Sequence, residues 1–229
     1  MPTPRTLSER VAQQSRRRRH DEKEDLRREI IDAAGALLLQ GGYDAFSMRR
    51  LAERIGYSAT TIYRYFRDKE AVIHAVLREG FRRFGSALKA AESSSDDAMA
   101  QLEAECHAYV RFGLENPTFY RVMFVDCVDT LGRFEHGPDE EPFDASYQVL
   151  VRTVARVAAR GFVPADRVEA LSALLWAQVH GIVVMLLTMP GMPPQLGAMM
   201  TADNARLVRV ALEAGALKDV RGGGHASPC

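Results

Sequence analysis

The chain has 229 residues, of which 47% are hydrophobic and 26% charged, and its 30 Lys and Arg balance its 30 Asp and Glu. This ordinary globular composition excludes a wholly disordered, collagen-like or low-complexity protein. The zero net charge hides an asymmetry, because residues 1–91 hold 19 basic and 12 acidic side chains while the rest hold 11 and 18. The sequence therefore predicts a basic module followed by an acidic one.

The cysteines and the apolar runs indicate in which cellular compartment the protein is expected. The three cysteines have unrelated spacings and form no Cys-x-x-Cys pair, so neither a disulfide framework nor a zinc site is indicated. The N-terminus has no apolar stretch that could serve as a secretory signal. The only long apolar run, residues 170–189, contains Ser172 and His180 and favours a buried helix over a membrane span. We expect a cytoplasmic, soluble protein with no metal and no cofactor.

Nearly every segment has the three- and four-residue apolar spacing of a helix, so the expected fold is all-α with about nine helices. Gly41-Gly42 should end the first helix, and Ser47, Ser58 and Asp68 are good N-caps for the next three. The expected helices are 24–40, 48–55, 59–65, 69–91, 97–115, 118–130, 143–160, 165–189 and 202–217.

Composition also predicts the domains. A Ser-Asp break at 93–97 coincides with the change in charge and separates two modules. The expected divisions are a disordered basic arm at 1–21, a basic module at 22–92, an acidic module at 93–218 and a disordered tail at 219–229.

Residues 47–66, SMRRLAERIGYSATTIYRYF, have the spacing of a helix-turn-helix. Ala52 falls where two helices cross, and a larger side chain there would hold them apart. Gly56, four residues later, permits the tight reversal between them. The small core should be filled by Leu51, Ile55 and Ile62. The second helix is then left facing outward, where it can enter a major groove.

The run FSMRRLAERIGYSATTIYRYFRDKEAVIHAVL, residues 46–77, resembles the DNA-binding region of bacterial TetR-type transcriptional regulators. The stretch from Ile62 to Lys69 is very specific to that family, and the close match covers about residues 24–85. The resemblance implies a three-helix DNA-binding head, a linking fourth helix and a helical ligand-binding body. It also implies a homodimeric repressor that binds a palindromic double-stranded DNA operator.

On this reading the outward face of the second helix meets DNA. Arg64 can pair with a guanine edge, and the methyls of Thr60 or Ala59 can touch thymine. The resemblance implies phosphate contacts at other positions, with Ser47, Thr61, Tyr65 and Lys69 as the anchors and Arg49 or Arg50 as an addition. The full candidate set is Ser47, Arg49, Ser58, Ala59, Thr60, Thr61, Tyr63, Arg64, Tyr65 and Lys69.

Several of these residues have a structural alternative. Tyr65 can pack inside the head, and Phe66 is assigned to the core. Arg49, Arg50 and Arg54 can form a solvated helix face. The basic run 16–20 can lie along phosphates or in a minor groove, or it can be a solubilising tail.

The second half is acidic and holds most of the aromatic residues. Trp176 and His180 lie four apart, on one helical face, beside Gly181. This element resembles the Trp-x-x-x-His-Gly element in the C-terminal domain of one TetR subgroup, as does the segment 115–124. The candidate ligand-binding residues, which suit a small apolar effector, are Tyr109, Phe112, Met123, Phe124, Cys127, Trp176, Gln178, His180 and Met185. About half of the aromatic residues can equally be plain core, and His180 can be a structural histidine.

The sequence also bears on assembly and on the choice of function. The resemblance implies that the dimer surface lies on the last two helices, 165–189 and 202–217. The first of these carries a stripe of small residues that fits close packing, either between two chains or within one chain: Ala170, Ala173, Ala177 and Gly181.

No Gly-x-Ser-x-Gly elbow, phosphate-binding glycine loop or HExxH motif is present, so an enzyme is not expected. The expected function is a ligand-released repressor. The alternatives are a regulator with a protein effector or none, or a carrier or enzyme that uses the helical body.

Overall fold

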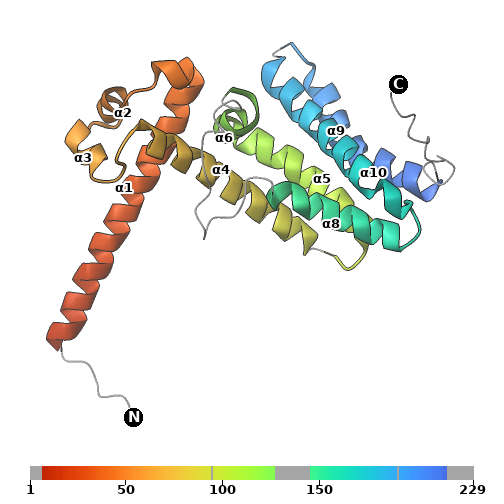
Figure 1. Cartoon of the computed structure of the whole chain (residues 1–229), viewed down its shortest axis with the longest axis horizontal. Helices are drawn as coiled ribbons and strands as arrows, with labels where there is room; N and C mark the ends of the chain where they lie inside the picture. The colour runs from red at the N-terminus through yellow and green to blue at the C-terminus, as the bar shows by residue number, and fades with distance from the viewer. Residues whose placement is uncertain (1–6, 94, 127–144, 190, 216–229) are drawn as a thin grey trace, which may run out of the picture. The chain divides into compact units, whose positions relative to one another are not determined.

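The computed structural model describes residues 7–93, 95–126, 145–189 and 191–215 (Figure 1). No β-strand occurs within these ranges, which confirms the all-α prediction. The α-helices are α1 (Leu7–Ala45), α2 (Met48–Ile55), α3 (Ala59–Tyr63), α4 (Lys69–Glu92), α5 (Ala98–Glu115), α6 (Pro117–Arg121), α8 (Ala145–Ala159), α9 (Val168–Thr188) and α10 (Pro194–Glu213). A π-helical turn at Val122–Asp126 follows α6, and a 3₁₀ turn at Ala165–Arg167 precedes α9.

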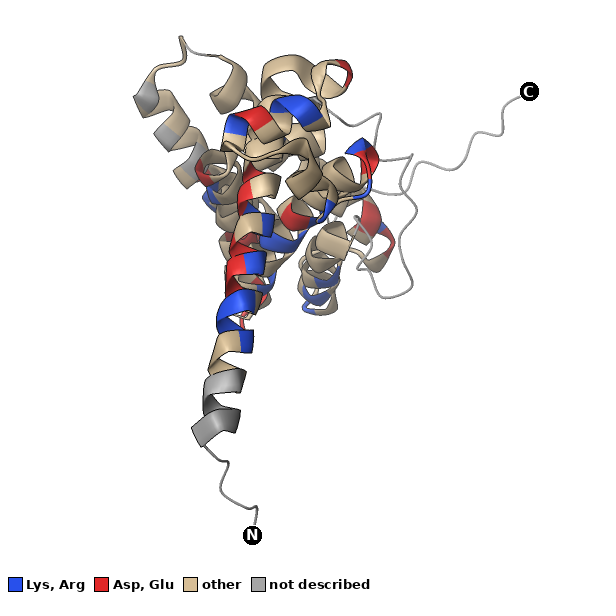
Figure 2. Cartoon of the chain, turned by 90° about the vertical axis from the view of Figure 1, so that its left-hand side faces the viewer, with Lys and Arg blue, Asp and Glu red and all other residues tan. Residues whose placement is uncertain are grey.

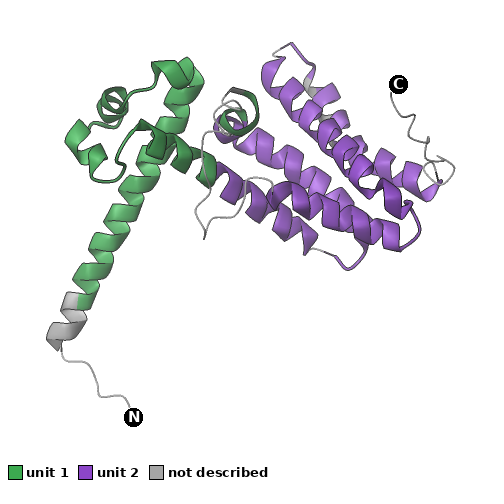
Figure 3. Ribbon diagram, viewed as in Figure 1, with its two compact units in different colours: residues 1–79, 121–134 green, residues 80–120, 135–229 purple. Residues whose placement is uncertain are grey.

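The chain forms two compact units (Figure 3). The head unit consists of residues 1–79 and 121–134, and the body unit of residues 80–120 and 135–229. The division falls inside α4, not at the break at 93–97 that composition suggested. A continuous helix satisfies its own backbone hydrogen bonds, so it can run from one unit into the next, whereas a change in charge marks the sequence and not the packing.

The helix α1 is longer than expected. Residues 7–20, which we expected to belong to a disordered arm, form its first turns. Arg, Glu and Gln are good helix formers, and Arg18 donates to Glu22 at 3.0 Å, one helical turn on. The predicted stop at Gly41-Gly42 takes the form of a kink, at which Gly42 has φ 68° and ψ −171°.

The head unit packs around a small core. Ile30 and Leu38 of α1, Leu51 of α2, Ile62 of α3 and Val76 of α4 are fully buried. Ile55, which we expected in this core, is only half-buried. Leu51 and Ile62 hold α2 and α3 against the first helix, as the spacing predicted.

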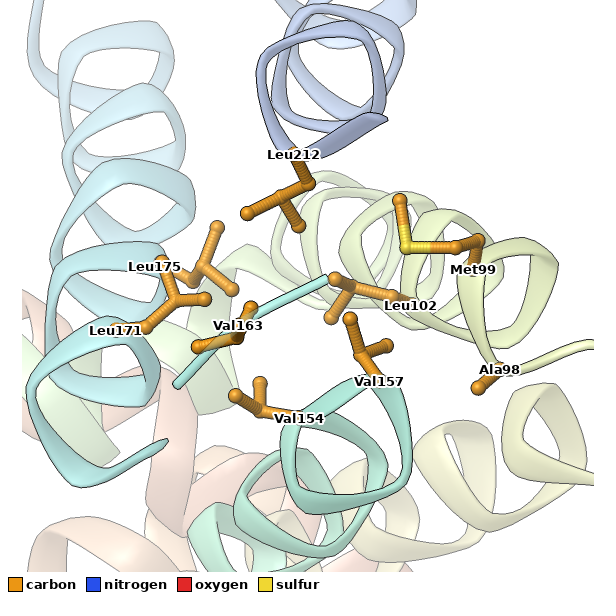
Figure 4. Packing of buried hydrophobic residues seen from close by; sticks show 9 residues of the cluster. All are labelled: Ala98, Met99, Leu102, Val154, Val157, Val163, Leu171, Leu175 and Leu212. Atoms are coloured by element: carbon orange, nitrogen blue, oxygen red, sulfur yellow. The ribbon is translucent and has the colours of Figure 1, made fainter. Parts of the chain in front are cut away.

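In the body unit α5, α8, α9 and α10 contribute to one hydrophobic cluster (Figure 4). Leu102, Val154, Leu175 and Leu212, one from each helix, point into it. The last helix begins at Pro194, earlier than expected, because proline at the first helical position has the required φ and needs no amide donor. The expected helix 118–130 is replaced by α6 and the π-helical turn as far as Asp126, and its remainder lies outside the described residues.

Candidate functional site

The link between α2 and α3 is a tight helix-turn-helix. Ser47 caps α2 by accepting a hydrogen bond from the Arg50 amide at 3.2 Å. Gly56 is left-handed, with φ 73° and ψ 24°, and the next amide, that of Tyr57, donates to the Ala52 carbonyl at 3.0 Å. Ala52 is 3% exposed at the crossing. The spacing therefore predicted both the turn and its position.

The short helix α3 is fixed mainly by its N-terminal cap. Ser58 accepts from the Thr61 amide at 3.1 Å, and its hydroxyl lies 2.9 Å from the Thr61 hydroxyl. Ile62 is the buried residue of α3. Regular α-helix ends at Tyr63, earlier than the expected Tyr65, and the following amides close a turn. One apolar anchor thus leaves the polar side of α3 facing outward.

The candidate DNA-binding residues on and after α3 have graded exposure. Thr60, Tyr63 and Arg64 are exposed, and Tyr63 keeps 53% of its surface accessible. The others are half-buried: Ala59, Thr61 and Tyr65. Arg64 makes no ion pair or side-chain hydrogen bond with another described residue, so its guanidinium donors are available to a partner. Phe66 is 4% exposed and belongs to the core, as assigned.

The arginines of α2 have partners within the head. Arg49 donates to Glu53 at 2.8 Å, and this hydrogen bond raises the pKa of the guanidinium. Arg50 donates to the Ala45 carbonyl at 2.7 Å, and Arg54 lies 3.4 Å from the side chain of Gln40. A phosphate at Arg49 would have to compete with Glu53.

Lys69, at the first position of α4, lies over an aromatic ring. Its Nζ is 3.9 Å from the centroid of Tyr43, whose hydroxyl donates to Glu70 at 2.9 Å. Sequence reasoning missed Tyr43, since no local spacing connects it with Lys69. The contact holds the ammonium in place at the start of the linking helix.

A second site lies in the body unit, where two tyrosines converge on a histidine. The Tyr120 hydroxyl is 2.7 Å from Nδ1 of His180, and the Tyr109 hydroxyl is 3.2 Å from both groups. Trp176 stacks on His180 with 5.3 Å between ring centroids. Tyr147 packs edge-on against Trp176. These five residues, Tyr109, Tyr120, Tyr147, Trp176 and His180, are called the aromatic network below.

Burial keeps the network neutral near pH 7. It raises the pKa of Tyr109 to about 12 and the pKa of Tyr120 further still, and it lowers the pKa of His180. Neutral groups that satisfy one another can line an apolar site at little cost. Gly113 lets α5 approach this site closely, because an added Cβ would collide with Val183 of α9 and touch Tyr120.

The structure brings together only part of the predicted ligand set. Tyr109, Trp176 and His180 meet in the network, and Phe112 packs beside Phe84, whose ring contacts Tyr109. Met185 is half-buried on α9. Sequence reasoning missed Tyr120 and Tyr147 as members, although Tyr120 lies in the segment 115–124 that the resemblance had singled out.

Three other predicted residues do not join the network, and a fourth is not described. Gln178 is exposed and, two residues from both Trp176 and His180, lies on another face of α9, so it does not join the network. Met123 and Phe124 belong to the π-helical turn in the head unit. Cys127 lies outside the described residues.

Two further features bear on the class of site. No group of His, Cys, Asp or Glu among the described residues is arranged to hold a metal ion. The segment Ala165–Thr188 is long and apolar enough to cross a membrane, with 28% of its most apolar window buried. In the structure α9, which forms most of this segment, contributes to the body core.

Comparison with known proteins agrees with both halves of the molecule. Residues 30–76 match the family of bacterial regulatory proteins of the tetR type, and residues 102–214 match a tetracyclin repressor-like C-terminal domain. The HTH-type transcriptional repressor Rv1474c of Mycobacterium tuberculosis is 40% identical over 60 residues, which cover 26% of this chain and 32% of that protein. The chain thus matches only about a third of the length of the first curated relatives.

Two longer matches extend into the body. The HTH-type transcriptional repressor AcnR of Corynebacterium glutamicum is 27% identical over 176 residues, covering 73% of this chain and 85% of that protein. A tetR-family regulatory protein from Rhodococcus RHA1 has a TM-score of 0.65 at 21% identity, over 81% of this chain and 96% of that one. At that identity the structural match shows the fold alone.

The capped turn between α2 and α3 and the outward-facing α3 define a helix-turn-helix fold of the class found in bacterial regulatory proteins. The two matching regions identify it further: the chain belongs to the TetR family.

Proposed function

We propose that the protein is a repressor whose hold on its operator is released when a small apolar effector enters the body unit. The observation that carries the proposal is the aromatic network, in which the buried residues Tyr109 and Tyr120 meet the half-buried His180, with Trp176 stacked on it and 38% exposed. Effector sites are mostly apolar with a few such polar groups. The pairing of Trp176 with His180 beside Gly181 supports assignment to the subgroup with a Trp-x-x-x-His-Gly element.

In this proposal the recognition face reads bases and its surroundings hold phosphates. Arg64 pairs with a guanine edge, and Thr60 and Ala59 contact thymine methyls. Five residues hold phosphates: Ser47, Ser58, Thr61, Tyr65 and Lys69. Arg49 leaves its hydrogen bond with Glu53 to contact a phosphate. Tyr63 lies on the same outward face as Arg64.

The proposed assembly is a homodimer formed through α9 and α10, which reads a palindromic operator. Leu174 on α9 and Leu207 on α10 are 67% and 64% exposed, an arrangement that favours an interface over a solvent-facing surface. Ala170, Ala173 and Ala177 are exposed beside Leu174, and a Cβ added at Gly181 would meet open space. Two recognition helices then address half-sites about 34 Å apart or a multiple of it.

Release works through the linking helix. α4 begins in the head unit and ends in the body unit, so a change in its position would move the recognition helix. An effector that binds more tightly to the arrangement of α4 with low operator affinity shifts the protein toward that arrangement. The loss of operator affinity is limited by the difference between the effector's affinities for the two arrangements. The location that goes with these partners is the cytoplasm.

The test starts from DNA that lies upstream of the protein's own gene. The full chain is titrated onto this fragment and onto a shuffled fragment of equal length, and a panel of apolar compounds that raise its melting temperature is then added. The proposal expects preferential binding of the first fragment and release by a stabilising compound. Stabilising compounds that leave operator affinity unchanged would favour a regulator with a protein effector or none.

A further inference from the structure

The N-terminal part of α1 carries its positive charge on one face. Residues 14–25 are exposed on every side, beyond the point where the helix enters the core at Ile30. Both signs of charge lie along this part of α1 (Figure 2). A helix has 3.6 residues per turn, so side chains three or four residues apart share a face.

The basic residues of this segment continue the series that forms the core. Ile30, Ala34 and Leu38 define the buried face of α1. The same spacing followed backwards from Ile30 gives a run of basic residues, here called the basic face: Arg27, Lys23, His20, Arg19 and Arg16. The face that packs inside the head therefore continues beyond it as a row of basic side chains.

The acidic residues are on the remaining faces: Asp21, Glu22, Glu24, Asp25 and Glu29. They pair with arginines that also lie off the basic face, since Arg18 contacts Glu22 and Arg28 contacts Asp25. In the described part of the chain, Arg16, Arg19 and Lys23 form no ion pair, so no described carboxylate neutralises them, and Arg19 donates only to the Ser15 carbonyl, at 3.3 Å.

One contact shows toward which side of the head this face points. The guanidinium of Arg27 lies 5.0 Å from the ring centroid of Phe66, shortly after α3. The basic face is thus on the side of α1 that meets the segment following α3, and Arg16 to Lys23 span about 10 Å along the helix. Duplex DNA is the polyanion that α3 already meets.

We propose that this helical arm docks its basic face on the phosphate backbone of DNA that flanks the half-site. Arg16, Arg19 and Lys23 each neutralise about one phosphate, while the acidic residues stay on the far side. The arm therefore adds affinity without reading sequence. The inference rests on DNA binding by the head, and it assigns to α1 a contact outside the helix-turn-helix.

The first experiment compares two matched triple variants of the full chain. One carries Arg16→Ala, Arg19→Ala and Lys23→Ala on the basic face, and the control carries three off-face changes: Arg17→Ala, Arg18→Ala and Arg28→Ala. Both remove three exposed positive charges and place alanine, a good helix former, in the same helix. The probe is a mixed-sequence 40-bp duplex, and the dissociation constant is measured against salt concentration.

The face of the helix decides the outcome. We expect the basic-face variant to bind at least about tenfold more weakly at low salt, with a log–log salt slope smaller by about 2 to 3. The control should change affinity by less than about threefold. An equal loss of DNA affinity in both variants would overturn the proposal and indicate a general effect of charge. No loss in either variant would also overturn it and would mean that the basic face does not contact DNA. Failure of the unaltered protein to bind the duplex at all overturns DNA binding by the head as well.

A second variant separates a helical arm from a flexible basic tail. Asp21→Pro breaks the helix between Arg19 and Lys23 while removing a negative charge. The lost negative charge alone would strengthen DNA binding, so weaker binding must come from the lost alignment of cations. We expect weaker binding and a smaller salt slope. Affinity that is unchanged or higher overturns the helical docking.

Discussion

The Tyr120 hydroxyl lies 2.7 Å from Nδ1 of His180, 60 positions away in the sequence. The Tyr109 hydroxyl lies 3.2 Å from both the Tyr120 hydroxyl and Nδ1 of His180. The two tyrosines and the histidine therefore form one hydrogen-bonded cluster that joins α5, α6 and α9. Burial lowers the pKa of His180 and so favours the neutral ring.

Tyr120→Phe should destabilise the protein by about 1 to 3 kcal/mol, because it removes a buried hydroxyl and leaves Nδ1 of His180 without its nearest hydrogen-bond partner. Urea unfolding at pH 7.5 measures the stability. Tyr57→Phe, at a tyrosine that is 44% exposed, is the control and should stay within about 0.5 kcal/mol. A Tyr120→Phe protein as stable as the unaltered chain would show that the network contributes nothing to folding.

The body unit also contains a buried carboxyl group. Glu105 is 3% exposed and receives a hydrogen bond from Thr153 at 2.5 Å, and its Oε2 has no hydrogen-bond partner among the described residues. Burial is the main cause that raises its pKa to about 7. Between about pH 4.5 and 7 the folded state therefore holds a proton that the unfolded state has lost. The contribution of Glu105 to stability falls as pH rises through this range.

Glu105→Gln should remove this dependence. The amide oxygen can still accept from Thr153, and no charge has to be buried above pH 7. We expect the variant to be more stable than the unaltered chain at pH 8, by up to about 3 kcal/mol, and the difference to shrink toward pH 5. Urea unfolding at the two pH values, with exposed Glu115→Gln as control, measures it. A gain that is the same at both pH values would mean that Glu105 does not titrate in this range.

The sequence was most informative where one local contact determines the structure. The caps at Ser47 and Ser58 and the turn at Gly56 depend on neighbours within five residues, and all three were predictable. The aromatic network joins positions 60 and 71 residues apart, so the pattern showed Trp176 beside His180 but not that Tyr120 meets them. The same limit hid the contact of Lys69 with Tyr43.

The arm shows a different limit. Because residues 1–21 contain no apolar run, composition alone predicted that they are disordered. In the structure α1 begins at Leu7, since charged residues with high helix propensity can extend an existing helix without a core. Gln178 shows the same limit. Its polarity suited both a ligand-binding group and a solvent-facing side chain, and in the structure it is exposed.

Arg64 and Lys69 should separate base reading from phosphate anchoring. Arg64 is exposed and has no partner among the described residues, so Arg64→Ala should relax the preference at one base position at a cost of about 1 to 3 kcal/mol. Lys69→Ala should weaken all sequences alike and lower the salt slope by about 1. Binding to the preferred duplex and to single-base variants of it, at several salt concentrations, measures both. If the two variants behave in the same way, the division between readout and anchoring is wrong.

The exposed leucines of α9 and α10 should hold two chains together. Leu174→Glu or Leu207→Glu places a charge on a surface that is 67% or 64% exposed in the single chain, so neither change should disturb the fold. At a dimer interface the same charge has to be desolvated without a partner, and we expect both variants to be monomers by light scattering. They should also lose the preference for DNA with two half-sites over DNA with one. Leu114→Glu, at an α5 leucine that is 42% exposed, is the matched control and should remain dimeric. Dimers in all three variants would place the interface elsewhere on the molecule.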